Sequence, residues 1–123
     1  MPSATERARE LPPGPELDAL FFETCWGWYV KSAGIYEHVV DQDGCHRLSY
    51  PKVTADAAAC DSWVMRWANE QGDLIWRVSN YNACIYRGDD FDLLAEEDGV
   101  DWKHALTRAA VAAKEQMEKR DGN

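Results

Sequence analysis

Residues 50–86, YPKVTADAAACDSWVMRWANEQGDLIWRVSNYNACIY, decide the fold. The first half of this stretch has apolar residues at three- and four-residue steps, which is the period of an amphipathic helix. We predict a helix that Thr54 caps, because a threonine hydroxyl can accept a hydrogen bond from a free N–H of the first turn. Gly72 ends it. The apolar stripe consists of Ala57, Cys60, Val64, Trp67 and Ala68, with Trp63 beside it.

The second half of the stretch predicts a β-hairpin. Residues 74–78 (LIWRV) and 83–86 (ACIY) are short runs rich in β-branched and aromatic residues. The turn-prone residues 80–82 (NYN) separate them. We expect a sheet built on this hairpin, with helices lying across it.

Two further helices flank the central stretch. The first begins at Pro15, which suits the first helical position, and Gly27 lies near its end. Its apolar stripe consists of Leu17, Leu20, Phe21, Cys25 and Trp28. The last is capped by Asp101 and has an alanine-rich apolar side, with Lys119 and Arg120 near its carboxyl end. Residues 35–40 are expected to form a strand, and residues 45–50 a possible second strand after the turn at 42–44.

This element order predicts the α+β class. We expect a small, mainly antiparallel sheet of three or four strands packed by three helices, in the order α-β-(β)-α-β-β-α. Residues 1–14 are expected to be a flexible N-terminal arm, because the pair Pro12-Pro13 separates this polar lead from the first helix. Residues 15–120 then form one sandwich domain, as the length of 123 residues suits.

The net charge restricts the classes of partner. It is −9, with a sequence pI of about 4.7. A negative field repels phosphate backbones, so we expect no direct nucleic-acid binding and instead docking to a basic protein surface. The first ten residues lack an apolar signal region, and no run has membrane-spanning length. We therefore expect a cytoplasmic protein whose cysteines, at positions 25, 45, 60 and 84, are reduced.

The chain resembles the phage ABA sandwich domain, a family of small bacteriophage and prophage proteins. The resemblance rests on residues 17–28, which end in Trp26-Gly27-Trp28, and on residues 50–63. There Pro51-Lys52-Val53 departs from the spacing of the family's motif. The strand around Trp76 and Val78 and the segment 105–110 are similar as well. The resemblance implies an α/β sandwich without established catalytic residues, in a bacterial host cell.

Residues 89–101 form the most acidic segment, without a single Lys or Arg. One interpretation is a solvated acidic loop that promotes solubility. The other is a phosphate mimic, in which spaced carboxylates occupy the Arg/Lys groove of a host protein. The candidate partner-binding residues are Asp89, Asp90, Asp92, Glu96, Glu97 and Asp98.

An alternative site would bind a small nucleotide signal. Arginine makes bidentate contacts to phosphate, and aromatic side chains stack on bases. The residues that carry this alternative are Arg77, Arg87, Trp76 and Tyr81.

Catalytic and metal sites are disfavoured. His38, Cys45, His46 and Cys60 are zinc-ligand types, but only Cys45 and His46 are close in sequence, and neighbours on a strand point to opposite faces. Cys45 or Cys60 with His38 or His104 has no local signature of a nucleophile. We therefore expect no enzyme, cofactor or metal.

The function predicted from the sequence is a phage-type accessory protein. It would inhibit a host defence complex, in the manner of an anti-CRISPR inhibitor, by binding a basic nucleic-acid-binding surface. Sequestration of a nucleotide signal and a role in virion assembly are the alternatives, and a homodimer is compatible with the many aromatic residues.

Overall fold

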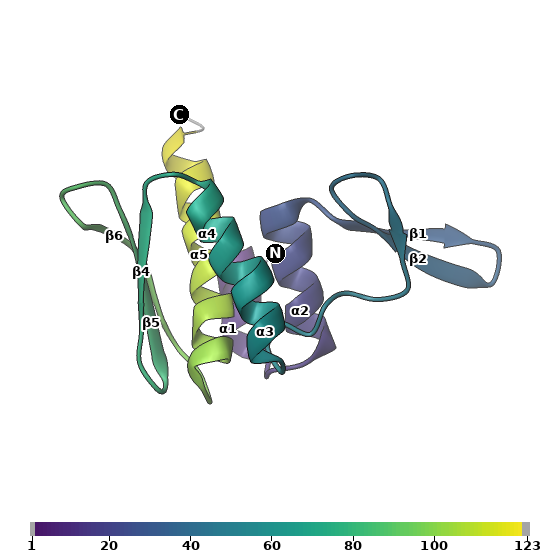
Figure 1. Cartoon of the computed structure of the whole chain (residues 1–123), viewed down its shortest axis with the longest axis horizontal. Helices are drawn as coiled ribbons and strands as arrows, with labels where there is room; N and C mark the ends of the chain where they lie inside the picture. The colour runs from purple at the N-terminus through teal and green to yellow at the C-terminus, as the bar shows by residue number, and fades with distance from the viewer. Residues whose placement is uncertain (1, 122–123) are drawn as a thin grey trace.

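The computed structural model describes residues 2–121, with the backbone alone at residue 33. Helical segments lie between two small sheets (Figure 1). The helices are α1 (Ala4–Glu10), α2 (Pro15–Phe21), α3 (Ala57–Cys60), α4 (Arg66–Glu70) and α5 (Trp102–Asp121), and the π-helical turns are η1 (Phe22–Trp26) and η2 (Asp61–Met65). The strands are β1 (Tyr29–Ala33), β2 (Tyr36–Val40), β3 (His46–Arg47), β4 (Leu74–Val78), β5 (Asn82–Arg87) and β6 (Asp92–Asp98). The predicted α+β class is confirmed, whereas the element order and the helix count differ.

The strands form two three-stranded antiparallel sheets instead of the single predicted sheet. Sheet A has the order β1-β2-β3, and sheet B has the order β4-β5-β6. The predicted hairpin is confirmed as β4 and β5, in which Trp76 pairs with Ile85. The possible strand at 45–50 is limited to His46 and Arg47. Strands β1 and β6 were not expected.

Helix α5 is the centre of the fold and lies between sheet B and the other helices (Figure 1). Its buried side is made of small residues, so neighbouring backbones can approach it closely. The side chains without solvent exposure on this helix are Ala105, Thr107, Ala109, Ala110, Val111 and Ala113. Asp101 caps the helix as predicted, since its carboxylate accepts a hydrogen bond of 2.9 Å from the His104 N–H.

Residues 4–10 form helix α1 and not part of a flexible arm. Ser3 caps the helix, and Ala8 is buried against the core. The carboxylate of Glu115 on α5 accepts hydrogen bonds from the Ala4 N–H at 2.8 Å and the Thr5 hydroxyl at 2.9 Å. The prediction of a flexible arm is therefore wrong for residues 4–10. This helix buries little apolar surface, but hydrogen bonds to Glu115, which is distant in sequence, hold it in place. Residue 1 of the predicted arm lies outside the described residues.

Thr54 ties two elements together and does not cap the central helix. The cap is Asp56, whose side chain accepts from the Ala58 N–H at 2.9 Å. Thr54 is buried, and its backbone N–H and hydroxyl both donate to Asp18 on α2, at 3.0 and 2.8 Å. The predicted stripe is buried at Cys60, Val64, Trp67 and Ala68, whereas Ala57 is exposed.

An aromatic cluster joins sheet A to the helices. The ring of Trp28 stacks on Phe22, with 4.3 Å between the centroids, and meets Trp63 edge-on at 5.1 Å. Arg47 of β3 lies over both indole rings. The buried carboxylate of Asp41 binds the Arg47 guanidinium at 2.9 Å and thereby holds the pKa of Asp41 below its usual value.

No helix among residues 2–121 is both long enough and apolar enough to cross a membrane.

Candidate functional site

The acidic segment is not a loop over most of its length. Residues 92–98 form strand β6, which pairs antiparallel with β5. Side chains of a strand alternate between its two faces, so the carboxylates are divided between the core side and the outer side of sheet B. The prediction of one solvated acidic loop is therefore wrong for this stretch. The apolar residues Leu94 and Ala95 hold it against the core.

Glu97 belongs to the interior and is unavailable to a partner. Its side chain is 6% exposed. Its carboxylate binds Arg9 of α1 through two short hydrogen bonds, from Nε at 2.9 Å and from Nη2 at 2.8 Å. Hydrogen bonding to Glu97 and the negative charge of its carboxylate raise the pKa of Arg9. Glu97 is thus a structural anchor for α1, and it drops out of the predicted partner-binding set.

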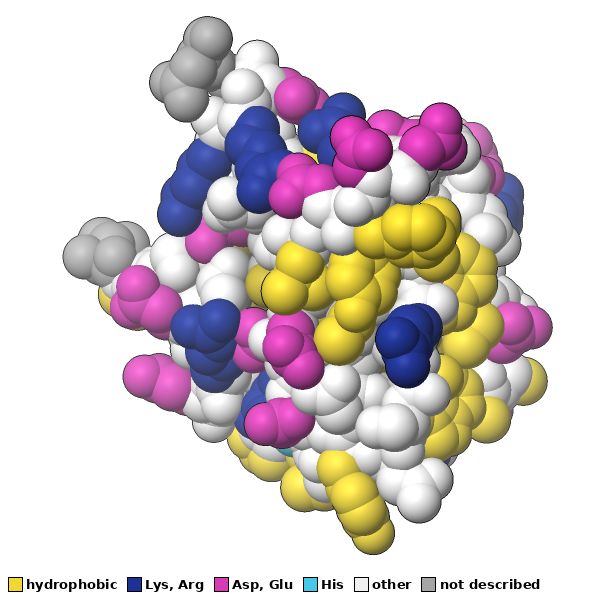
Figure 2. All heavy atoms as spheres, turned by 90° about the vertical axis from the view of Figure 1, so that its left-hand side faces the viewer, with side chains coloured by type: hydrophobic (Ala, Val, Ile, Leu, Met, Phe, Trp, Pro, Cys, Tyr) yellow, Lys and Arg dark blue, Asp and Glu magenta, His cyan; other side chains and the backbone are white. Residues whose placement is uncertain are grey.

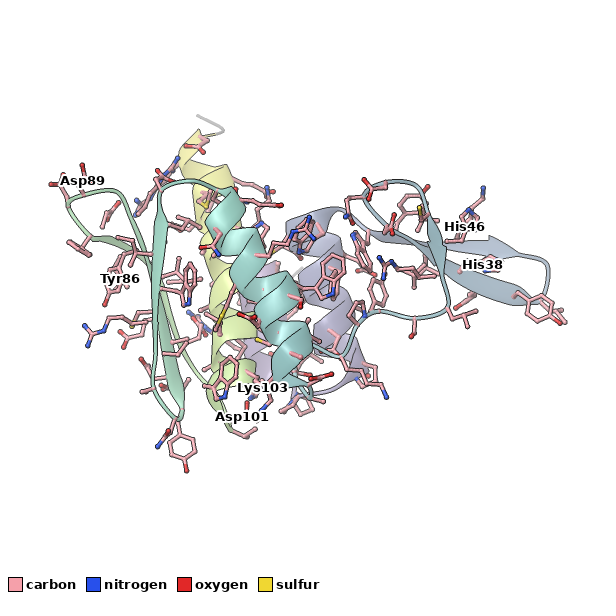
Figure 3. The ribbon with its side chains drawn as sticks, viewed as in Figure 1. His38, His46, Tyr86, Asp89, Asp101 and Lys103 are labelled. Atoms are coloured by element: carbon pink, nitrogen blue, oxygen red, sulfur yellow. The ribbon has the colours of Figure 1, made fainter. Side chains whose placement is uncertain are left out.

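The other predicted carboxylates lie on the surface. Asp92 is ion-paired with Arg120 near the end of α5. Glu96 and Asp98 point to the same side of β6, where the side-chain amide of Asn82 donates to both. Asp89 and Asp90 lie in the turn between β5 and β6, with Asp89 at its tip (Figure 3).

An apolar row crosses the outer face of sheet B next to these carboxylates. Ile75 pairs with Tyr86, and Tyr86 pairs with Leu93, so the three side chains form one row across the sheet. Ile75 is 41% exposed and Leu93 45% exposed. Phe91, 59% exposed, meets the Tyr86 ring edge-on. Figure 2 shows apolar side chains gathered on this face with acidic side chains at its margin.

Arg77 lies in the neighbouring row of the same face. It pairs with Cys84, which in turn pairs with Glu96. No ion pair or side-chain hydrogen bond engages the Arg77 guanidinium anywhere in residues 2–121. We name the set Ile75, Arg77, Tyr86, Phe91, Leu93, Asp89, Asp90, Glu96 and Asp98 the outer face of sheet B.

The four residues of the predicted nucleotide site do not converge. Trp76 packs against the core, whereas its neighbour Arg77 is on the outer face. Arg87 is bound to Asp73 at 3.1 Å and to Asp121 at 3.5 Å. Tyr81 lies in the β4–β5 turn, exposed to solvent. The alternation of strand β4 separates the indole from the guanidinium that was expected to work with it.

The zinc-type residues are also scattered. His38 and His46 lie on neighbouring strands of sheet A, with 5.4 Å between the ring centroids (Figure 3). Cys60 is in the helical core, where burial raises its pKa to about 12. Among residues 2–121 no three His, Cys, Asp or Glu side chains form a group that could hold a metal ion. All four cysteines, each within the described range, are free thiols.

His104 is a structural residue in the core. Its Nδ1 accepts a hydrogen bond from the Val100 N–H at 3.0 Å, and its Nε2 lies 3.0 Å from the Leu11 carbonyl. The ring is therefore neutral with the proton on Nε2, which donates to that carbonyl. Burial lowers the pKa of His104 from its ordinary value of 6.5, and the charge of Arg108 acts in the same direction.

This lowered pKa predicts a loss of stability in mild acid. The unfolded chain binds a proton at residue 104 more readily than the folded chain, so the free energy of unfolding falls as the pH drops below about 6.5. The loss is complete below the pKa of the folded state. Urea titrations at about pH 7.5 and 5.5 should show a smaller pH dependence for His104→Asn than for the unmodified chain. An equal dependence in both proteins would contradict this role of His104.

Comparison with protein-family models, curated proteins and solved structures finds no match. The resemblance to the phage ABA sandwich domain stays a prediction.

The apolar row of the outer face was not predicted from the sequence. A signal was present, because Ile75 and Arg77 alternate with Leu74, Trp76 and Val78 in a strand that was correctly predicted. The register shift between Ile85 and Tyr86 places Leu93 opposite Tyr86.

Proposed function

We propose that the protein is a non-enzymatic binding module that docks another protein on the outer face of sheet B. The observation that carries the proposal is the exposed row Ile75–Tyr86–Leu93 with carboxylates along its margin. A buried apolar centre and a charged rim are the usual anatomy of a protein interface. The carboxylates would set orientation and association rate, and the apolar row would supply most of the affinity.

The charge of this face defines the chemistry of the partner. Asp89, Asp90, Glu96 and Asp98 are acidic, and the whole chain carries a net charge of −9. A complementary partner surface has an apolar patch that lysine and arginine border. An acidic group of the partner lies opposite Arg77. We propose that this is a protein surface that otherwise holds nucleic acid, since such surfaces concentrate basic residues. Inhibition of a host defence complex is the specific form of the proposal.

The test compares two sets of surface variants. The first reverses three rim carboxylates (Asp89→Lys, Asp90→Lys, Glu96→Lys), and the second removes the apolar row (Ile75→Ser, Leu93→Ser). A matched control reverses three exposed carboxylates elsewhere (Glu10→Lys, Glu16→Lys, Asp43→Lys), which gives the same change in net charge. Proteins retained from a bacterial lysate by the unmodified chain are identified, and their affinities are measured with purified components.

We expect one retained basic protein whose affinity falls at least tenfold in both outer-face variants and stays within about threefold in the control. The reversed rim should also weaken the salt dependence of binding. Competition with nucleic acid for the same partner would support the defence-inhibitor form. Retention that is equal in all variants would overturn the proposal. Sedimentation equilibrium gives a second test. If the unmodified chain is a homodimer and the outer-face variants are monomers, a second copy covers this face and the proposal is overturned.

A further inference from the structure

A cavity of about 280 Å³ lies between α2, sheet A and the segment that leads from β3 to α3. Its lining is mostly apolar, with Val39 buried, Tyr50 half-buried, and Val30 and Leu48 exposed to solvent. This volume is close to the lower limit of pockets that bind small molecules. The cavity is on sheet A, at the opposite end of the molecule from the outer face of sheet B (Figure 1).

One acidic side chain lines this cavity from the protein interior. Asp18 is 2% exposed, and both hydrogen bonds from Thr54 go to the same oxygen, Oδ1. Within residues 2–121 no donor binds Oδ2. Every fully enclosed side-chain oxygen in this range has a hydrogen-bond partner. Asp18 lines the cavity, and Thr54 engages Oδ1 alone, so Oδ2 is the carboxylate oxygen left as an acceptor for a ligand there.

The surroundings of Asp18 favour a cation over a neutral donor. Asp18 is almost completely buried, so its negative charge is poorly solvated, and this burial raises the pKa of the carboxyl. An ammonium group would replace the missing solvation with a charge-assisted hydrogen bond to Oδ2. The apolar walls would accommodate the rest of the ligand, and the net charge of −9 attracts cations to the molecule.

We propose that this cavity binds a small organic ammonium ion with an apolar body, whose ammonium group donates a hydrogen bond to Asp18. The site is independent of the proposed protein-docking face, so either proposal can fail without the other.

Two charged residues at the cavity affect this binding in opposite ways. Lys52 is exposed, and its positive charge favours the ionised form of Asp18 but competes with a bound ammonium ion. Glu37 contributes a second carboxylate to the lining. Replacing Lys52 with methionine, which is similar in length and uncharged, should therefore strengthen binding. A zwitterionic ligand that used Lys52 for its own carboxylate would show the reverse.

The experiment uses 2-phenylethylammonium as the probe and 2-phenylethanol as its uncharged counterpart. Binding to the full chain is measured by calorimetry, and NMR shifts of the Val30 and Val39 methyl groups locate it. Asp18→Asn keeps the Oδ1 acceptor for Thr54 but replaces Oδ2 with an N–H donor. Glu16→Gln is the matched control, because it removes an exposed carboxylate from the same helix outside the cavity.

We expect saturable binding of the ammonium probe, at least tenfold weaker binding of the alcohol, and at least a tenfold loss in Asp18→Asn. Glu16→Gln should bind within about twofold of the unmodified chain, and Lys52→Met should bind more tightly. The Lys52→Met result does not depend on whether Asp18→Asn folds. Absence of saturable binding, equal binding of the alcohol, or methyl shifts confined to residues that do not line the cavity would overturn the proposal.

Discussion

Replacing Trp28 with alanine is expected to lower the free energy of unfolding by about 4 kcal/mol. The indole is 2% exposed, stacks on Phe22 and contacts the edge of Trp63. Its Nε1–H donates a hydrogen bond of 2.7 Å to Gln42 beyond β2. The substitution removes a large buried ring and also one of the links between sheet A and the helices. Urea unfolding followed by far-UV circular dichroism measures the change without relying on tryptophan fluorescence.

Two further variants separate packing from hydrogen bonding at this position. Trp28→Phe keeps an aromatic ring but loses the bond to Gln42, so about 1–2 kcal/mol should be lost. Tyr36→Ala removes an exposed ring from the same sheet and should change stability by less than about 0.5 kcal/mol. A loss below about 1.5 kcal/mol for Trp28→Ala would mean that sheet A is held by other contacts.

Trp28 also illustrates what periodicity can predict. The stripe from Leu17 to Trp28 was assigned from three- and four-residue steps, and all of its members are buried or half-buried. The central helix, the β4–β5 hairpin and the cap of α5 follow from equally local signals. These elements bury one apolar face each, so their sequence pattern is strong.

Strand β6 could not be predicted in the same way. Aspartate and glutamate are poor strand formers, and the sequence DLLAEED reads as an acidic loop with a short apolar anchor. What makes it a strand is pairing with β5 and an ion pair between Glu97 and Arg9, 88 residues away in sequence. The register shift at Ile85 and Tyr86 also breaks the period of two. The candidate surface depends on this strand, so its apolar row was missed.

The predicted set of partner-binding carboxylates was only partly right. A list of acidic residues does not show which of them are already paired, and Glu97 and Asp92 are bound within the chain. Asp89, Asp90, Glu96 and Asp98 remain at the surface. Asp18 could not be singled out as a candidate, because no sequence pattern shows that Thr54 binds one of its oxygens.

Replacing Arg108 with alanine is expected to lower the free energy of unfolding by about 3 kcal/mol. Its guanidinium donates to the carbonyls of Ala8, Arg9 and Leu11 at the end of α1, and of Asp98 at the end of β6, at 2.8–2.9 Å. A helix end leaves its last carbonyls without partners inside the helix. Arg108 supplies those partners from α5, and its positive charge suits the carboxyl end of α1.

The effect should be concentrated in α1. Helix α1 has seven residues and buries only Ala8, so it cannot persist without the bonds to Arg108, Glu115 and Glu97. We therefore expect the α1 amides of Arg108→Ala to lose nearly all protection through local opening of this helix. The β4 and β5 amides should stay protected and accelerate only as far as the global free energy of unfolding falls. Arg108→Lys should restore little, because one ammonium group cannot reach four carbonyls. Lys114→Ala, which removes an ion pair with Glu118 on the same helix, should leave α1 protected. Unchanged α1 exchange in Arg108→Ala would show that Glu115 and Glu97 suffice to hold the helix.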